Sequence, residues 1–165
     1  GGLVSIVSTK EYRSQMPQVI IGNKKWMSQN RKLVTDMLAA IFEGGDRVKA
    51  GDSGLKEAAA VSAHVYNEKD AAYGAKYFKI LALTDKQGLS VELGGSAVSN
   101  LADNLQLFGL EKGSTNLFAL TYTGFGTVVK SQYPNILSDF YPAAEVLDTS
   151  YLEELQKAAT PQGKR

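Results

Sequence analysis

The chain lacks cysteine altogether, and this absence excludes disulfide bonds, zinc–thiolate sites and catalysis by a thiol nucleophile. The absence is compatible with an oxidising compartment such as the periplasm. The chain has one histidine, His64, which lies on the polar side of a predicted helix. Because metal-binding and catalytic histidines need partner residues, His64 is expected to be exposed and structural, and no metal or other cofactor is expected.

An excess of charge of either sign is also missing, since 18 basic and 17 acidic residues give a net charge of +1. Nucleic acid is therefore not an expected partner, and neither is an anionic membrane surface. No apolar run approaches the roughly 20 residues that span a bilayer, so direct membrane insertion is not expected, and no signal peptide is recognised. The chain starts within a predicted strand, residues 3–7, which favours a piece of a longer protein.

The composition is that of an ordinary globular domain, with 165 residues of which 44% are hydrophobic and 21% charged. Alternating and β-branched runs predict short strands, and apolar residues at three-and-four spacing predict amphipathic helices. The predicted strands are 3–7, 19–21 and 89–93, and the predicted helices are 26–42, 55–68, 71–83, 96–108, 114–133 and 151–158. The pattern indicates a helix-rich α/β fold.

Several residues mark where these helices begin and end. Asn23 can cap the first helix, and Gly44-Gly45 is expected to stop it in the usual C-terminal manner. Trp26, in the first turn, is expected to anchor the core. The segment from Ser114 to Tyr133 fits helix and strand patterns in part, and its length favours a buried helix.

The strongest candidate for a binding site is the stretch from Glu92 to Asn104. The strand at 89–93 reaches a Gly-Gly pair, and Ser96 is expected to open the helix that follows. Glycines let the backbone approach a ligand, and the free N–H groups at a helix N-terminus favour an anion or a polar oxygen. An ordinary strand-to-helix turn without a ligand accounts for the same residues.

Catalytic signatures are missing from the sequence. It has no G-x-S-x-G elbow, no P-loop and no calcium-binding loop, and Lys112-Gly113-Ser114-Thr115 carries the lysine and glycine of a P-loop in reversed order. The carboxylates of Asp103 and Glu153-Glu154 have no visible acid–base partner. These absences favour a binding protein over an enzyme.

Several stretches, in order along the chain, carry a family resemblance: Val7–Glu11, Met16–Gly22, Asn30–Val34 with Ala39–Gly44, Gly94–Leu110 and Leu147–Leu152. Together they resemble the C-terminal half of type II periplasmic solute-binding proteins of ABC transporters, a group described as nitrate, taurine, thiamine-precursor or phosphate binders. The likeness is greatest to members in which this domain precedes a peptidoglycan-binding domain of the outer-membrane-protein type.

The resemblance implies two α/β lobes joined by crossing strands, with the ligand held in a cleft. It also implies that residues 1–158 form the C-terminal half of such a protein and that 159–165 are a linker or disordered tail. The expected function is extracytoplasmic solute binding for ABC-type uptake or envelope sensing, with a transporter permease or an envelope protein as partner. A periplasmic or other extracytoplasmic location follows from the same likeness.

Candidate ligand-binding residues follow from position. Ser8 and Thr9 stand at the C-terminal end of a predicted strand, and Gly95, Ser96 and Asn100 stand at a predicted helix N-terminus. Their hydroxyl and N–H groups suit a small polar or anionic ligand, although no Arg or Lys stands beside Ser96. A ligand-free adaptor of the cell envelope is the main alternative. An enzyme related to the thiamine-precursor binders is a weaker one, because such relatives are expected to show His or Cys clusters.

Overall fold

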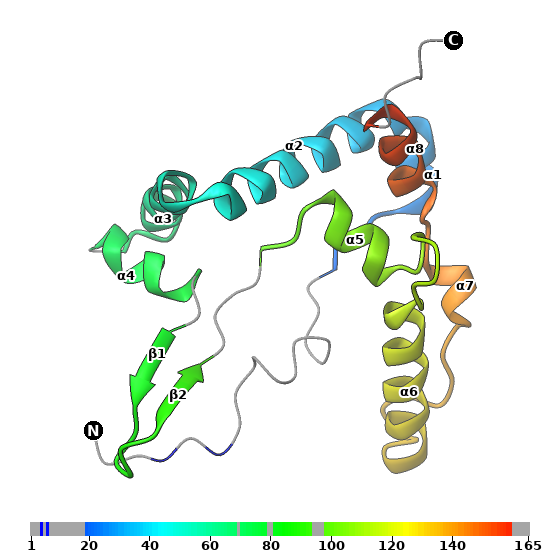
Figure 1. Ribbon diagram of the computed structural model, residues 1–165. Coiled ribbons are helices and arrows are strands. Elements are labelled where there is room, and N and C mark those ends of the chain that lie inside the picture. The colour runs from blue at the N-terminus through cyan, green and yellow to red at the C-terminus, as the bar shows by residue number, and fades with distance from the viewer. Residues whose placement is uncertain are drawn as a thin grey trace. The chain divides into compact units, whose positions relative to one another are not determined.

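The computed structural model describes Val4, Ile6 and residues 19–68, 70–78, 81–93 and 98–159. Its elements follow the order α1 (Lys24–Gln29), α2 (Arg31–Ala50), α3 (Asp52–Tyr66), α4 (Ala71–Tyr77), β1 (Leu81–Thr84), β2 (Ser90–Leu93), α5 (Leu101–Leu107), α6 (Leu117–Gln132), α7 (Ala143–Val146) and α8 (Ser150–Ala159) (Figure 1). Helices predominate, and the described residues form one sheet of two strands. The predicted helix-rich α/β character is therefore confirmed at this level.

The chain divides into two compact units. One unit contains Glu43–Ser99, and the other contains Val19–Phe42 together with the chain from Asn100 onward. Helix α2 passes from one unit to the other between Phe42 and Glu43. Among the described helices, none has the length and apolar character needed to cross a membrane.

In the first unit, α3 packs against α4, and β1 pairs with β2 in a hairpin. Gly74 of α4 lies close to Ala59 of α3, where an added Cβ would be 3.8 Å from the Ala59 side chain. The hairpin turn is held by Asp85, whose Oδ1 accepts hydrogen bonds from the backbone N–H groups of Gln87 and Leu89, at 2.8 and 3.0 Å. These bonds hold the turn between β1 and β2.

One prediction within this unit is wrong in part. The helix predicted over residues 71–83 ends at Tyr77, because Leu81–Thr84 pair antiparallel with β2 instead. Helix α3 begins at Asp52 and has no side-chain cap. His64 is exposed in the last turn of α3, as its pattern predicts.

The turn between α2 and α3 depends on two glycines. Gly51 has φ +150°, a conformation that side chains disfavour, and it ends α2. Gly54 lies against the end of α2 so closely that an added Cβ would collide with the backbone carbonyl of Arg47. These two positions let α3 start directly after α2.

Helix α2 therefore continues beyond the predicted stop at Gly44-Gly45, and this prediction is wrong. Both glycines keep negative φ and stay helical, so neither provides the left-handed residue that ends a helix. Asn30 instead separates α1 from α2, and its side-chain N–H group donates to the Trp26 carbonyl at 2.9 Å. Asn23 caps α1 as predicted, because its Oδ1 accepts a hydrogen bond from the Trp26 backbone N–H.

The core of the second unit joins α2, α5 and α8. Phe42, Leu105 and Leu152 form a buried cluster, and partly buried hydrophobic residues pack against it: Leu38, Leu101, Phe108, Leu110 and Leu155. The end of α5 supports this cluster through Gly109, which has φ +70°. The Leu110 backbone N–H then donates to the Leu105 carbonyl at 2.8 Å, which is the bonding of a Schellman motif. Gly109 thus terminates α5.

Helix α6 (Leu117–Gln132) confirms that the segment from Ser114 to Tyr133 is helical, but the prediction that this helix is buried is wrong. Asn116 caps the helix by accepting a hydrogen bond from the Ala119 N–H at 2.8 Å, and the helix ends at Gln132 with Tyr133 as its C-cap. One side carries aromatic contacts, with ring centroids 5.4 Å apart for Phe108 and Phe118. No residue of α6 is buried, and helix α7 lies beside it (Figure 1).

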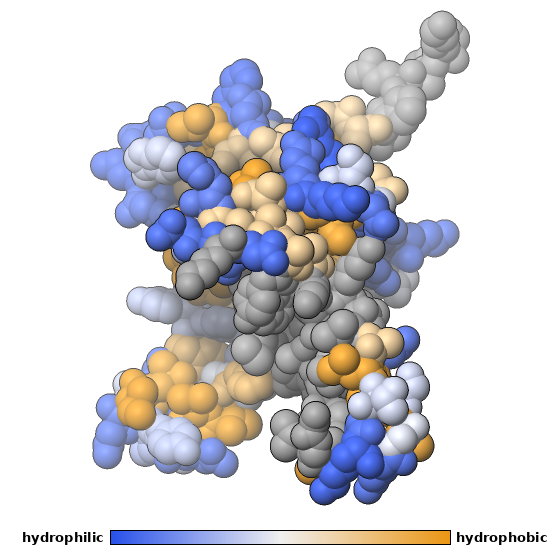
Figure 2. Space-filling view, turned by 90° about the vertical axis from the view of Figure 1, so that its left-hand side faces the viewer, coloured by the Kyte–Doolittle hydropathy of each residue, from blue (hydrophilic) through white to orange (hydrophobic). Residues whose placement is uncertain are grey.

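Hydrophobic side chains are numerous at the surface of the described residues. Trp26, predicted to anchor the core, is 50% exposed, and α1 has no buried residue. Val19, Ile20 and Ile21 are exposed and form no strand, so the strand predicted at 19–21 is wrong. Figure 2 shows hydrophobic residues at the surface beside hydrophilic ones. The strand predicted at residues 3–7 lies almost wholly outside the described residues, as does the tail from residue 160.

An ion pair between Lys130 of α6 and Asp139 is expected to make stability depend on pH. Their Nζ and Oδ1 atoms are 2.9 Å apart, and this hydrogen bond, with a second from the Phe140 N–H, holds the pKa of Asp139 below its usual value. A carboxyl whose pKa is lower in the folded state stabilises the fold above its unfolded pKa, about 3.9, and loses that contribution as pH falls through the folded value.

We therefore expect Asp139→Asn to lower the free energy of unfolding slightly at neutral pH. The difference in this free energy between the variant and the unsubstituted chain should vanish on acidification below about pH 4. Urea unfolding of both chains between pH 7 and pH 2.5 measures this difference. Lys130→Gln serves as the matched variant, since it should raise the pKa of Asp139 in an NMR titration. A difference that stays constant over the whole pH range would contradict the prediction.

Candidate functional site

Asn100 is the one predicted site residue that the structure places, and it is the N-cap of α5. Its Oδ1 accepts a hydrogen bond from the Asp103 backbone N–H at 3.0 Å, and Asp103 Oδ2 accepts one from the Asn100 backbone N–H at 3.0 Å. This reciprocal pair is a capping box. The helix therefore begins at Leu101, and the prediction that Ser96 opens it is wrong.

The other four predicted residues, Ser8, Thr9, Gly95 and Ser96, lie outside the described residues. Their meeting at one site with Asn100 thus stays a prediction. In the sequence, Gly95 and Ser96 stand between β2 and α5. Strand β2 ends at Leu93 and α5 begins at Leu101, so the connection is residues 94–100.

The start of α5 is already supplied with a negative charge. The carboxylate of Asp103 lies in the first turn, where it complements the positive end of the helix dipole. Two of the N–H groups there, those of Asn100 and Asp103, donate to side-chain oxygens of the capping box. An anionic ligand at this end of α5 would lie near the Asp103 carboxylate. It would also find the N–H groups of Asn100 and Asp103 already hydrogen-bonded.

A second polar cluster joins the start of α2 to the start of α8. Arg31 Nε donates to Glu154 Oε2 at 2.8 Å, and Arg31 Nη1 donates to Ser150 Oγ at 3.1 Å. The guanidinium carbon also lies 4.3 Å from the centroid of the buried Tyr151 ring, a distance typical of a cation–π contact. Three contacts from one side chain fasten α8 to α2.

Further hydrogen bonds extend this cluster along α8. Ser150 Oγ donates to Asp148 Oδ1 at 2.6 Å, and Thr149 Oγ1 donates to Glu153 Oε1 at 2.9 Å. Thr35, a buried polar residue of α2, lies 3.5 Å from Glu154 Oε1 through its hydroxyl. The serine and threonine hydroxyl groups of this cluster bond to carboxylates that also form an ion pair or accept a backbone N–H bond. The cluster therefore has a structural role. The sequence gives no signal for it, since Arg31 and Glu154 are 123 residues apart.

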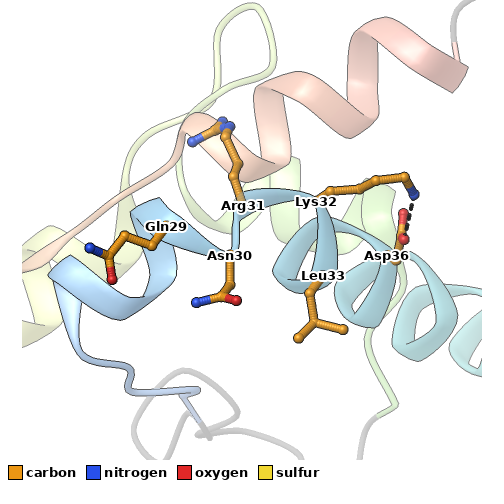
Figure 3. Close-up of a pocket in the computed structure, with 6 residues that line it drawn as sticks. All are labelled: Gln29, Asn30, Arg31, Lys32, Leu33 and Asp36. Carbon is orange, nitrogen blue, oxygen red and sulfur yellow. Dashed lines mark hydrogen bonds and ion pairs between the residues drawn. The ribbon is translucent and has the colours of Figure 1, made fainter.

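A surface depression of about 460 Å³ lies at the junction of α1 and α2. Six consecutive or neighbouring residues line it: Gln29, Asn30, Arg31, Lys32, Leu33 and Asp36 (Figure 3). Lys32 Nζ and Asp36 Oδ2 form an exposed ion pair across one side at 2.6 Å, while Arg31 points toward α8. Exposed ion pairs of this kind contribute little to stability. The charged groups of Lys32 and Asp36, which could hold a ligand, already bind each other.

Metal binding finds no support within the described part of the chain. No group of three or more His, Cys, Asp or Glu residues there has an arrangement that could hold an ion. Glu153 and Glu154 are adjacent in the sequence, and their carboxylates bond to Thr149 and Arg31, respectively. The chemistry that these residues offer is hydrogen bonding and ion pairing.

The chain was compared with known families, proteins and structures. No protein-family model, no curated protein and no solved structure matches it. Its function is therefore inferred from its own residues.

Proposed function

We propose that the chain is a non-enzymatic solute-binding module, one lobe of a type II solute-binding protein that serves ABC-type uptake or envelope sensing. One observation carries the proposal. In the sequence, Gly94 and Gly95 stand between β2, which ends at Leu93, and α5, whose first turn is capped by Asn100. A strand, a glycine-rich connection and a helix in this order form a common ligand-binding arrangement in α/β proteins.

The proposed binding residues are Ser8, Thr9, Gly95, Ser96 and Asn100. Hydroxyl groups both donate and accept hydrogen bonds, and glycine lets a ligand approach the backbone. Such groups suit a small polar molecule such as a polyol, an amide or a zwitterion.

The charge at the start of α5 refines the ligand class. The Asp103 carboxylate is held at this helix end by the Asn100 N–H, at 3.0 Å. A negative ligand group nearby would be repelled, because like charges at short range disfavour one another in a partly buried site. The proposal is therefore a neutral or zwitterionic polar ligand in preference to an inorganic anion.

The proposed setting is extracytoplasmic, with a transporter permease or an envelope protein as the partner of the ligand-loaded module. It rests on the family resemblance of the sequence, together with the absence of cysteine, which suits an oxidising compartment. The structure contributes the helix-rich α/β architecture with which this setting is compatible.

Ligand binding predicts thermal stabilisation. In the full chain, a polar ligand at ten times its Kd should raise the free energy of unfolding by about 1.4 kcal/mol. A thermal-shift panel should contain polyols, amides and zwitterions in one arm and nitrate, sulfonate and phosphate in the other. Stabilisation by anions alone would overturn the ligand class but keep solute binding, whereas no stabilisation in either arm would overturn solute binding.

A matched pair of substitutions separates the capping role of Asn100 from its proposed role in binding. Asn100→Ala should lower the free energy of unfolding by about 1 kcal/mol, because it removes the N-cap oxygen, whereas Asn100→Ser should retain stability, because serine caps equally well. Chemical unfolding measures both. Asn100→Ser should still weaken ligand binding, since serine lacks the amide group. Unchanged affinity in that variant would remove Asn100 from the site and leave it as a cap alone.

An adaptor of the cell envelope is the second candidate, and one surface favours it. Leu117, Leu120, Phe125 and Val128 of α6 are exposed, and several exposed hydrophobic side chains on one helix are typical of a contact with another protein. A pull-down with peptidoglycan-associated proteins, set beside the ligand panel, distinguishes the two functions. Specific retention without any ligand-dependent stabilisation would favour the adaptor.

A further inference from the structure

We draw no further inference here: the strongest candidate, the exposed apolar surface of α6 formed by Leu117, Leu120, Phe125 and Val128, carries none because nothing in the structure shows what covers it.

Discussion

Phe42→Ala should lower the free energy of unfolding of the second unit by about 3–5 kcal/mol, the usual cost of removing a buried aromatic ring. Phe42 is 8% exposed and packs in one cluster with Leu105 of α5 and Leu152 of α8. The side chains around the cluster are only partly buried, so they can relax toward the space that the ring leaves. The loss should therefore lie toward the lower end of that range.

Leu33→Ala is the matched control for Phe42→Ala, because Leu33 lies on the same helix but is 58% exposed. Its effect should stay within about 0.5 kcal/mol, as is usual for surface positions. Urea unfolding of the full chain, followed by far-UV circular dichroism, measures both variants against the unsubstituted chain. Similar losses for the two variants would show that the cluster around Phe42 is not the core.

Alanine substitutions at two glycines of α6 should have effects of opposite sign. Gly124→Ala should stabilise the chain by about 0.5–1 kcal/mol, because the position is helical and an added Cβ meets nothing within 4 Å. Gly126→Ala should destabilise it by about 1–3 kcal/mol, the typical cost of overpacking. An added Cβ at Gly126 would lie 2.7 Å from the ring of Phe140.

The Phe140 ring cannot simply withdraw from Gly126, because it also meets the Tyr122 ring edge-on, with centroids 5.7 Å apart. Thermal unfolding measures both glycine variants, and near-UV circular dichroism reports the tyrosine environment. A double variant, Gly126→Ala with Phe140→Leu, should recover part of the stability that Gly126→Ala alone loses. Equal stabilisation by the two single alanines would show that Phe140 does not pack on Gly126.

Most helix positions could be predicted because apolar residues recur at helical spacing, but helix ends depended on backbone conformation. The pair Gly44-Gly45 has the composition of a C-terminal stop, yet it remains helical, and Gly45 is buried. The actual stop is Gly51, the first glycine after α2 with positive φ. Composition cannot distinguish a glycine that turns the chain from one that allows close packing.

Strands were harder to predict than helices because a strand needs a partner. Val19–Ile21 has three β-branched residues, but it forms no ladder in the structure. Leu81–Thr84 follows a helical pattern, but the Asp85 turn brings it opposite Ser90–Leu93. Short apolar runs fit both secondary structures, and pairing decides between them.

For the candidate site, the sequence contained one signal that was overlooked. Asn100 and Asp103 stand three residues apart, the spacing of a capping box, and this places the start of α5 at Leu101. The cluster around Arg31 had no such signal, because its partners come from α8 and only folding brings them together. Local motifs can be found in a sequence, whereas contacts between distant segments require the structure.

The tight turn between α2 and α3 restricts the evolution of the chain at one position. The Arg47 carbonyl occupies the space where any side chain at Gly54 would begin, so all nineteen alternatives meet the same obstacle. Gly44 and Gly124, which have open space beside them, meet none. Natural selection acting on the fold alone therefore holds Gly54 fixed and leaves Gly44 and Gly124 open to neutral drift.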